Sequence, residues 1–164
     1  MKRQKGQDIV EFALLLPIFL LVLCGIIYCG FMFGDYQTVQ GIVRNAAREA
    51  AVVEPTRDEG NPPKLKYDYQ KIKDKYDEIL KNENVITHLY VPDVSGENGI
   101  RIDLGSNLKK DLPDASIPDD SVGAVLTMNL TTSDISFVNY MKNVVGIPES
   151  YKVSCFMYRE KTSL

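Results

Sequence analysis

The sequence predicts an α+β protein, in which a long N-terminal transmembrane helix continues into a small extracytoplasmic domain with an antiparallel sheet and short helices. Three patterns lead to this prediction. An uncharged apolar run occupies residues 12–34, apolar residues recur at helical spacing up to residue 53, and much of the second half of the chain alternates apolar and polar residues. Helices followed by strands in this order are typical of α+β proteins.

The first element is the apolar run, which contains no charged residue over 23 positions. At about 1.5 Å per residue, a helix of this length reaches roughly 35 Å and can cross the hydrocarbon core of a bilayer. A buried core helix is the alternative, but a chain of 164 residues can hardly bury every face of such a helix. A cleaved secretory signal is disfavoured because its apolar region would be shorter, about 7–15 residues. The far end also carries Tyr28, Phe31 and Phe33. We therefore expect an anchor that stays attached to the chain.

The charges around the anchor predict its orientation. Lys2, Arg3 and Lys5 precede it with no acid among them, so the positive-inside rule places the N-terminus in the cytoplasm and the C-terminus outside the plasma membrane, as a single-pass protein. The first 11 positions hold three of the 19 basic residues and two of the 22 acidic residues. The rest of the chain therefore has a net charge near −4. This charge gives no reason to expect nucleic-acid binding.

The residues that lead into the anchor have a distinctive spacing. A basic leader ends at Gly6, so a cut after this glycine makes Gln7 the first residue and Glu11 the fifth. This arrangement resembles the class III signal of type IV pilins. The sequence Glu11-Phe12-Ala13-Leu14, followed by Leu16-Pro17, resembles the TadE-like minor pilins (pseudopilins) of the tight-adherence (Tad, or Flp) pilus. The resemblance continues through Gly34-Asp35-Tyr36-Gln37 and residues 44–51, and it covers roughly the first third of the chain.

The resemblance implies a processed pilus subunit with a pilin-like fold. A prepilin peptidase would cut between Gly6 and Gln7, where glycine gives a membrane peptidase close access to an extended backbone. Glu11, with Phe12 beside it, is implied in docking, since the glutamate at this position pairs with the N-terminal amine of a neighbouring pilin. The implied partners are other pilins and pseudopilins of the same system, the prepilin peptidase, the inner-membrane assembly platform and membrane lipid.

Two glycines near the end of the anchor are a candidate packing face. Gly30 and Gly34 have the small-xxx-small spacing that lets another helix approach closely. Glycine is common in membrane helices, so an anchor without a specific packing partner is the alternative.

Beyond the anchor, we expect the same helix to continue and a second helix to follow. The first helix continues because Tyr36, Val39, Val43, Ala46 and Ala50 step by three or four, until Pro55 ends it and a breaker-rich linker follows over residues 54–63. The second, amphipathic helix is predicted from Leu65, Tyr69, Ile72, Tyr76 and Ile79 and ends near Asn82. The expected organisation is a leader of residues 1–6, a transmembrane helix of residues 7–34, its extracytoplasmic continuation over residues 35–53, and an outer α+β domain of residues 54–164.

Three or four antiparallel strands are expected to pack against the long helix. They are residues 85–91, the alternating Ile100, Ile102 and Leu104, the alternating Val122, Ala124, Leu126, Met128 and Leu130, and the alternating Tyr151, Val153, Cys155 and Met157. A short helix over residues 135–145, with Ser133 as its cap, is predicted between the last two strands.

No catalytic or cofactor site emerges from the sequence. His88 is the only histidine and falls in a predicted strand, where a structural role is favoured. The acidic loop of residues 111–120 lacks the spacing of an EF-hand, so a solvated loop is favoured over a calcium site. Cys24, Cys29 and Cys155 give neither a disulfide framework nor a metal-ligand spacing. We expect no enzyme, no metal and no cofactor.

Two interpretations of the function remain. In the first, the chain is a minor pilin or pseudopilin that acts in assembly of a Tad-type pilus. In the second, it is an unprocessed, single-pass, membrane-anchored extracytoplasmic binding protein. They differ in whether the Gly6–Gln7 bond is cut. The sequence leaves open whether the chain is TadE-like or TadF-like, and whether it acts at the tip, in priming or in the membrane.

Overall fold

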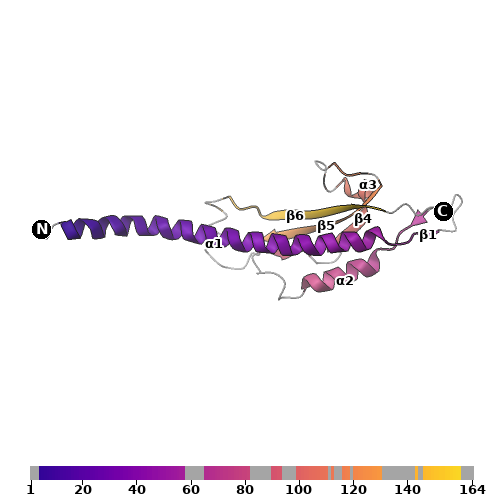
Figure 1. The fold of residues 1–164 in the computed structure, drawn as a ribbon, viewed down its shortest axis with the longest axis horizontal. Helices are drawn as coiled ribbons and strands as arrows, with labels where there is room; N and C mark the ends of the chain where they lie inside the picture. Colours follow the sequence, from indigo (N-terminus) through magenta and orange to yellow (C-terminus); the bar gives the residue numbers. More distant parts are fainter. Residues whose placement is uncertain are drawn as a thin grey trace. The chain divides into compact units, whose positions relative to one another are not determined.

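The computed structural model describes residues 4–57, 65–81, 90–93, 99–110, 112, 116–118, 120–130, 143 and 146–159. The chain divides into two compact units, Met1–Gly34 and Asp35–Leu164. Its first element, helix α1 (Gln4–Ala51), contributes to both units (Figure 1). The elements that follow it are strands and short helices, which confirms the predicted α+β class.

The first unit presents apolar side chains on every side of α1. Large apolar residues are exposed from Ile9 to Phe33, and each residue of the run 18–23 is among them. Successive residues are rotated by about 100° around a helix, so six consecutive exposed residues cover its full circumference. A helix that is apolar all round belongs in a core or in a membrane. Over Gln7–Ala51 the most apolar window reaches a mean hydropathy of 2.8 and is only 6% buried, so α1 is a candidate membrane anchor.

In the second unit, one stripe of α1 is completely buried. Its members have no exposed surface and recur at helical spacing: Val39, Val43, Ala46, Ala47 and Ala50. The helix ends at Ala51, two residues earlier than predicted. The amide groups of Val52 and Val53 donate to the carbonyl oxygens of Glu49 and Ala50, each over 3.3 Å, and so tighten the last turn before Pro55.

Strand β5 (Ser121–Leu130) is the centre of an antiparallel sheet. Strand β6 (Ser150–Tyr158) pairs along nearly its whole length, from Ser121↔Tyr158 to Asn129↔Ser150. A strand has only two edges, so β3 (Tyr90–Pro92) and β4 (Arg101–Leu104) share the other one, opposite 128–130 and 122–125 respectively. The predicted strands are confirmed here, although of residues 85–91 only Tyr90 and Val91 lie within the described part of the chain.

The core of the second unit lies between this sheet and α1. Along β5, Val122, Ala124, Leu126 and Met128 point to one face and have no exposed surface. On the same face, the ring of Tyr151 in β6 lies 6.1 Å from the ring of Tyr36 in α1. Figure 1 shows the second half of α1 running along β5 and β6. Small residues such as Ala46 and Ala50 let the helix backbone approach the larger side chains of the sheet.

The opposite face of the sheet is partly covered by helix α3 (Gly105–Leu108), which the sequence did not reveal. Gly123 of β5 is essential to this cover, because a Cβ atom at this position would overlap the ring of Phe156 and come within 3.0 Å of Leu108. Leu108 itself is fully buried. A glycine in the middle of a strand here marks a close approach rather than a bend.

Helix α2 (Gln70–Lys81) is shorter than predicted. Leu65 and Lys66 do not begin it; they form β2, which pairs with β1 (Thr56–Arg57) in the segment expected to be a linker. The carboxylate of Asp68 accepts a hydrogen bond from the backbone amide of Gln70 over 3.0 Å and so marks the helix start. Tyr76 and Leu80 are the buried residues, whereas Ile79 is 36% exposed.

Polar contacts hold α2 within the second unit. Its Lys75 forms an ion pair with Glu49 of α1. The carboxylate of Asp77 accepts a hydrogen bond from the amide of Ile100 over 2.8 Å, just before β4. A Cβ on Gly99 would overlap that carboxylate, which explains the glycine. The helix predicted over residues 135–145 lies outside the described residues, apart from Asn143.

Candidate functional site on the N-terminal helix

The predicted processing site lies in the first turns of α1. Gly6 and Gln7 both belong to this helix, with Gln7 exposed. A peptidase that cuts an extended backbone would have to unwind the helix at this point. Glycine is a poor helix former, by roughly 1 kcal/mol relative to alanine, and helix ends fray readily. The position of Gly6 near the start of α1 therefore lowers the cost of access.

Glu11 and Phe12 are exposed on the next turn. Phe12 has 66% of its surface exposed. Among the residues that the structure describes, the carboxylate of Glu11 has no ion-pair or hydrogen-bond partner. The acid Asp8 precedes Glu11 by three positions, so the two carboxylates are neighbours on the helix surface. The first basic residue after Gly6 is Arg44, which lies about 50 Å beyond Glu11 along the helix axis. Between Gly6 and Arg44 the sequence thus offers these acids no basic side chain.

Gly30 and Gly34 leave open space beside α1. Their spacing puts them on one side of the helix, and a Cβ atom at either position would meet nothing within 4 Å. A partner helix would therefore find no obstacle at these two residues. Glu11 lies 19 residues before Gly30, about 28 Å along the axis. The candidate residues therefore lie at two separate places on the same helix. Glu11 and Phe12 form one place, and Gly30 and Gly34 form the other.

A family model matches the N-terminal part of the chain. Residues 6–48 match the family model described as TadE-like protein. This segment is similar to TadE-like proteins, and we call it the TadE-like segment. The resemblance seen in the sequence is thereby confirmed, and it associates the chain with the Tad pilus system. No curated protein and no solved structure matches the chain. The TadE-like segment includes every candidate site residue, from Gly6 and Gln7 to Gly34.

A buried acid within the TadE-like segment was missed as a separate feature by sequence reasoning. Asp35, the first charged residue after the uncharged run, is only 2% exposed. It lies close enough to Tyr151 of β6 for its charge to act on the phenol. The ring of Tyr151 packs edge-on against that of Tyr90 at 4.8 Å, and the Tyr90 hydroxyl donates to the carbonyl oxygen of Pro148 over 2.9 Å. This cluster fixes the start of the second unit on α1.

The described part of the chain provides no metal centre. It contains no group of three or more His, Cys, Asp or Glu side chains that could hold a metal ion. Cys24, Cys29 and Cys155 are free thiols. Burial raises the pKa of the Cys155 thiol, although Arg44 partly opposes the effect. His88 and three of the four acids in the loop 111–120 lie outside the described residues; the fourth, Asp120, is described.

The pKa values of two tyrosines indicate how the stability of the second unit changes at high pH. Burial raises the pKa of Tyr69 and of Tyr151 to about 12, and the carboxylate of Asp35 adds to the effect at Tyr151. Unfolded tyrosines lose their protons near pH 10, so the folded state binds more protons between about pH 10 and 12. The contribution of these two tyrosines to stability should therefore be constant below pH 10 and be lost as the pH rises through this window. Because both rings are partly exposed, we expect a loss on the order of 1 kcal/mol per tyrosine.

The variant Tyr69→Phe isolates one of these contributions. The Tyr69 hydroxyl is buried without a hydrogen-bond partner among the described residues, so its removal should leave stability at pH 8 unchanged or raise it by about 1 kcal/mol. It should also make the decline above pH 10 shallower. Thermal unfolding followed from pH 7 to 11.5 measures both effects. A variant that is less stable at pH 8 would show that the hydroxyl has a partner. A variant whose stability declines as steeply as that of the wild type would show that Tyr69 does not cause the decline.

Proposed function

We propose that this chain is a minor pilin or pseudopilin that acts in the assembly of a Tad-type pilus and docks through its N-terminal helix. The observation that carries the proposal is the combination of an exposed glutamate, Glu11, with a following helix surface that is apolar on every side and free of charge up to Asp35. The TadE-like match over the same residues supports it.

The chemistry of docking follows from the position of Glu11. After cleavage the amine of Gln7 is a cation, and Asp8 and Glu11 are two acids within one turn of it. An unpaired carboxylate at the edge of the hydrocarbon region costs free energy or takes up a proton. A neighbouring subunit whose N-terminal amine reaches Glu11 removes that cost. Only one stagger between two anchor helices brings the groups together, so the acid selects the register while the apolar surface provides the contact area.

The proposed topology and partners follow from the same segment. Lys2, Arg3 and Lys5 would remain in the cytoplasm and the second unit would lie outside the plasma membrane. The prepilin peptidase would act on the cytoplasmic side, and the assembly platform and other pilins would meet the anchor within the membrane. Gly30 and Gly34 would let a neighbouring helix approach to backbone distance.

The processing step is tested by Gly6→Val. A β-branched side chain restricts the backbone and obstructs the close approach of the peptidase. We therefore expect at least about a tenfold fall in the processed fraction. Immunoblots of membranes from cells with an active prepilin peptidase would show the longer, unprocessed form. Gly41→Val is the matched control, because Gly41 is exposed on α1 and a Cβ there meets nothing within 4 Å. Normal processing of Gly6→Val, or equal loss in both variants, would contradict the assignment of this site.

A second candidate function is an unprocessed membrane-anchored binding protein. The observation that favours it is a pair of polar cavities in the second unit, the larger of about 420 Å³. In this case residues 1–6 would remain attached and Glu11 would be an ordinary interfacial residue. The Gly6→Val comparison separates the two functions, because an unprocessed protein gives the same form with or without the substitution.

A further inference from the structure

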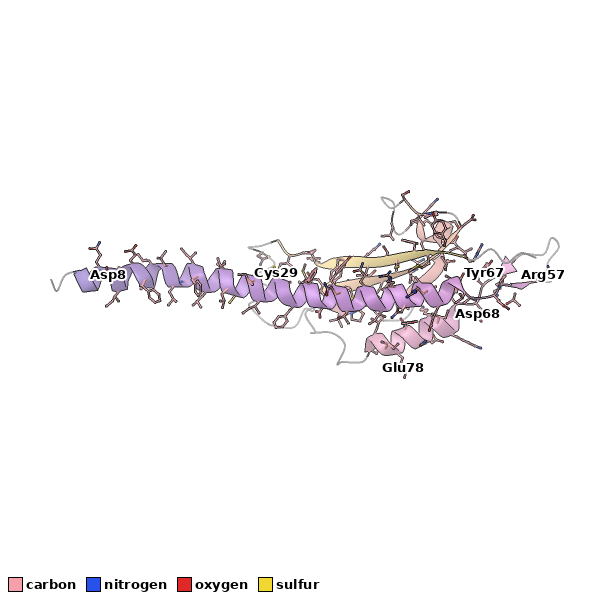
Figure 2. The ribbon with its side chains drawn as sticks, in the orientation of Figure 1. Asp8, Cys29, Arg57, Tyr67, Asp68 and Glu78 are labelled. Carbon is pink, nitrogen blue, oxygen red and sulfur yellow. The ribbon has the colours of Figure 1, made fainter. Side chains whose placement is uncertain are left out.

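Two polar cavities adjoin each other in the second unit, where β1 and β2 meet the start of α2. The first, of about 420 Å³, is lined by Thr56, Arg57 and Lys66 together with Tyr67 and Asp68. The second, of about 300 Å³, shares Tyr67 and Asp68 and extends to Lys73 and Asp103. Figure 2 shows Arg57, Tyr67 and Asp68 gathered at one end of this unit. Because the cavities share two residues, one elongated ligand can occupy both.

Three cationic side chains line these cavities: Arg57, Lys66 and Lys73. Arg57 and Lys66 are exposed. Within the described ranges, neither they nor Lys73 have an ion-pair or hydrogen-bond partner for their side chains. The guanidinium of Arg159, which is not among the lining residues of either cavity, lies over the ring of Tyr67, 4.6 Å from its centre. Cationic side chains that are exposed and unpaired favour an anionic group on the ligand.

The acids of the cavities are already held in place. One oxygen of Asp68 accepts the amide of Gln70 over 3.0 Å. One oxygen of Asp103 accepts the amide of Leu104 over 2.7 Å and the side-chain amide of Asn107 over 2.9 Å. In each case no described residue donates to the second oxygen. Each carboxylate therefore has an oriented acceptor that suits a hydroxyl group.

Two aromatic rings lie beside these groups. Tyr67 and Tyr69 are stacked, with ring centres 6.0 Å apart and planes only 7° from parallel. Burial raises the pKa of Tyr69 to about 12, so its phenol is neutral over the physiological pH range. Parallel tyrosines next to charged side chains provide flat apolar surface within a polar cavity.

We propose that the two cavities bind neighbouring residues of an acidic glycan. Arg57 and Lys66, which both line the first cavity, attract the carboxylate of a uronic-type sugar. Asp68 and Asp103 accept hydrogen bonds from sugar hydroxyls, and the tyrosines contact the apolar faces of the rings. The volumes fall at the lower end of the range of about 300–1,000 Å³ that small ligands occupy. The chain is near −4 beyond its first 11 residues, which gives no reason to expect a nucleic acid as the ligand.

The test uses the full-length protein in phosphatidylcholine nanodiscs and a defined probe, tetragalacturonate. Its fully methyl-esterified form has the same sugars without the charges and serves as the matched ligand. By isothermal titration calorimetry we expect the charged tetramer to bind with a Kd below about 1 mM and at least tenfold more tightly than the ester. The double variant Arg57→Gln/Lys66→Gln should lose at least tenfold in affinity for the charged tetramer. The control Lys71→Gln, which changes an exposed lysine outside the cavities, should bind like the wild type.

The outcomes separate this proposal from general charge attraction and from the proposed function. Equal loss in Lys71→Gln, equal binding of the ester, or no binding of the charged tetramer would overturn it. Tighter binding of a short single-stranded DNA of the same charge would also overturn it. Melting temperatures of the variants within about 2 °C of the wild type ensure that a lost signal reflects the site. Asp103→Asn provides a further check, because it weakens the hydroxyl contact while leaving Arg57 and Lys66 in place. The binding measurement needs no pilus, so its result does not depend on whether the proposed role in pilus assembly is correct.

Discussion

Glu11→Gln is expected to leave the protein inserted and cleaved but to lower its crosslinking to neighbouring pilin anchors at least about tenfold. The substitution keeps the shape of the side chain and removes its charge, so the N-terminal amine of the neighbour is left unpaired in a region with little water. Removal of one partner from a buried ion pair costs about 3–5 kcal/mol, and each 1.4 kcal/mol corresponds to a factor of ten in affinity. Site-specific crosslinking of anchor helices in intact cells, with the amount of pili counted in parallel, measures the effect.

Asp8→Asn is the matched control for this experiment. It makes the same chemical change three residues before Glu11, on an acid that is also exposed on α1. We expect it to retain most of the crosslinking. If Glu11→Gln crosslinks to the same partners at the same yield and pili still form, Glu11 is only an interfacial residue. The unprocessed binding protein would then be the better account.

Leu126→Ala is expected to have the largest effect on the stability of the second unit. Leu126 lies in the middle of β5 with no exposed surface, opposite Val153 of β6, which is 1% exposed. Truncation of a buried leucine leaves a cavity and costs about 2–5 kcal/mol, a large part of the 5–15 kcal/mol of a typical domain. The melting temperature should fall by at least about 6 °C. The measurement is thermal unfolding, by circular dichroism, of a soluble fragment that begins at Asp35.

The same fragment tests whether the second unit folds without the anchor. Its own sheet and the buried stripe of α1 lie within Asp35–Leu164, so the wild-type fragment should show mixed helix and strand. Val52→Ala is the matched control, since Val52 is 69% exposed and its truncation should shift the melting temperature by less than about 2 °C. A disordered wild-type fragment, or equal shifts in both variants, would contradict this description of the core.

The fold was largely predictable wherever one face of an element is buried. Val39, Val43, Ala46 and Ala50 have helical spacing, and all four are fully buried. The alternation from Val122 to Met128 likewise identified the face of β5 that packs on α1. In both cases the hydrophobic pattern and the local geometry agree, which is the condition under which sequence patterns are informative.

The start of α2 could not be read from the same pattern. Leu65 and Tyr69 continue the helical spacing of Ile72 and Tyr76, yet the helix begins only at Gln70. Pairing of Leu65 with Arg57 in β1, and the hydrogen bond from Gln70 to Asp68, set the boundary instead. Contacts between distant segments thus overrode a local periodicity. Helix α3 was missed for a related reason, because four residues are too few to show a period.

The candidate site was predicted in a different way. Gly6, Gln7 and Glu11 were selected by their spacing and by resemblance, and the match over residues 6–48 supports the family rather than the role of each residue. Cleavage after Gly6 and docking through Glu11 stay predictions. The polar cavities had no signal in the sequence, because Arg57, Lys66, Asp68 and Asp103 come from elements whose pairing only the fold reveals.

Intact-mass spectrometry of the wild-type protein is the most direct test of the central claim, that this chain is a processed pilus subunit. The protein should be extracted from membranes of cells with an active prepilin peptidase. The account predicts a single species that begins at Gln7 and lacks residues 1–6. A species that begins at Met1 or Lys2 in the same cells would contradict it.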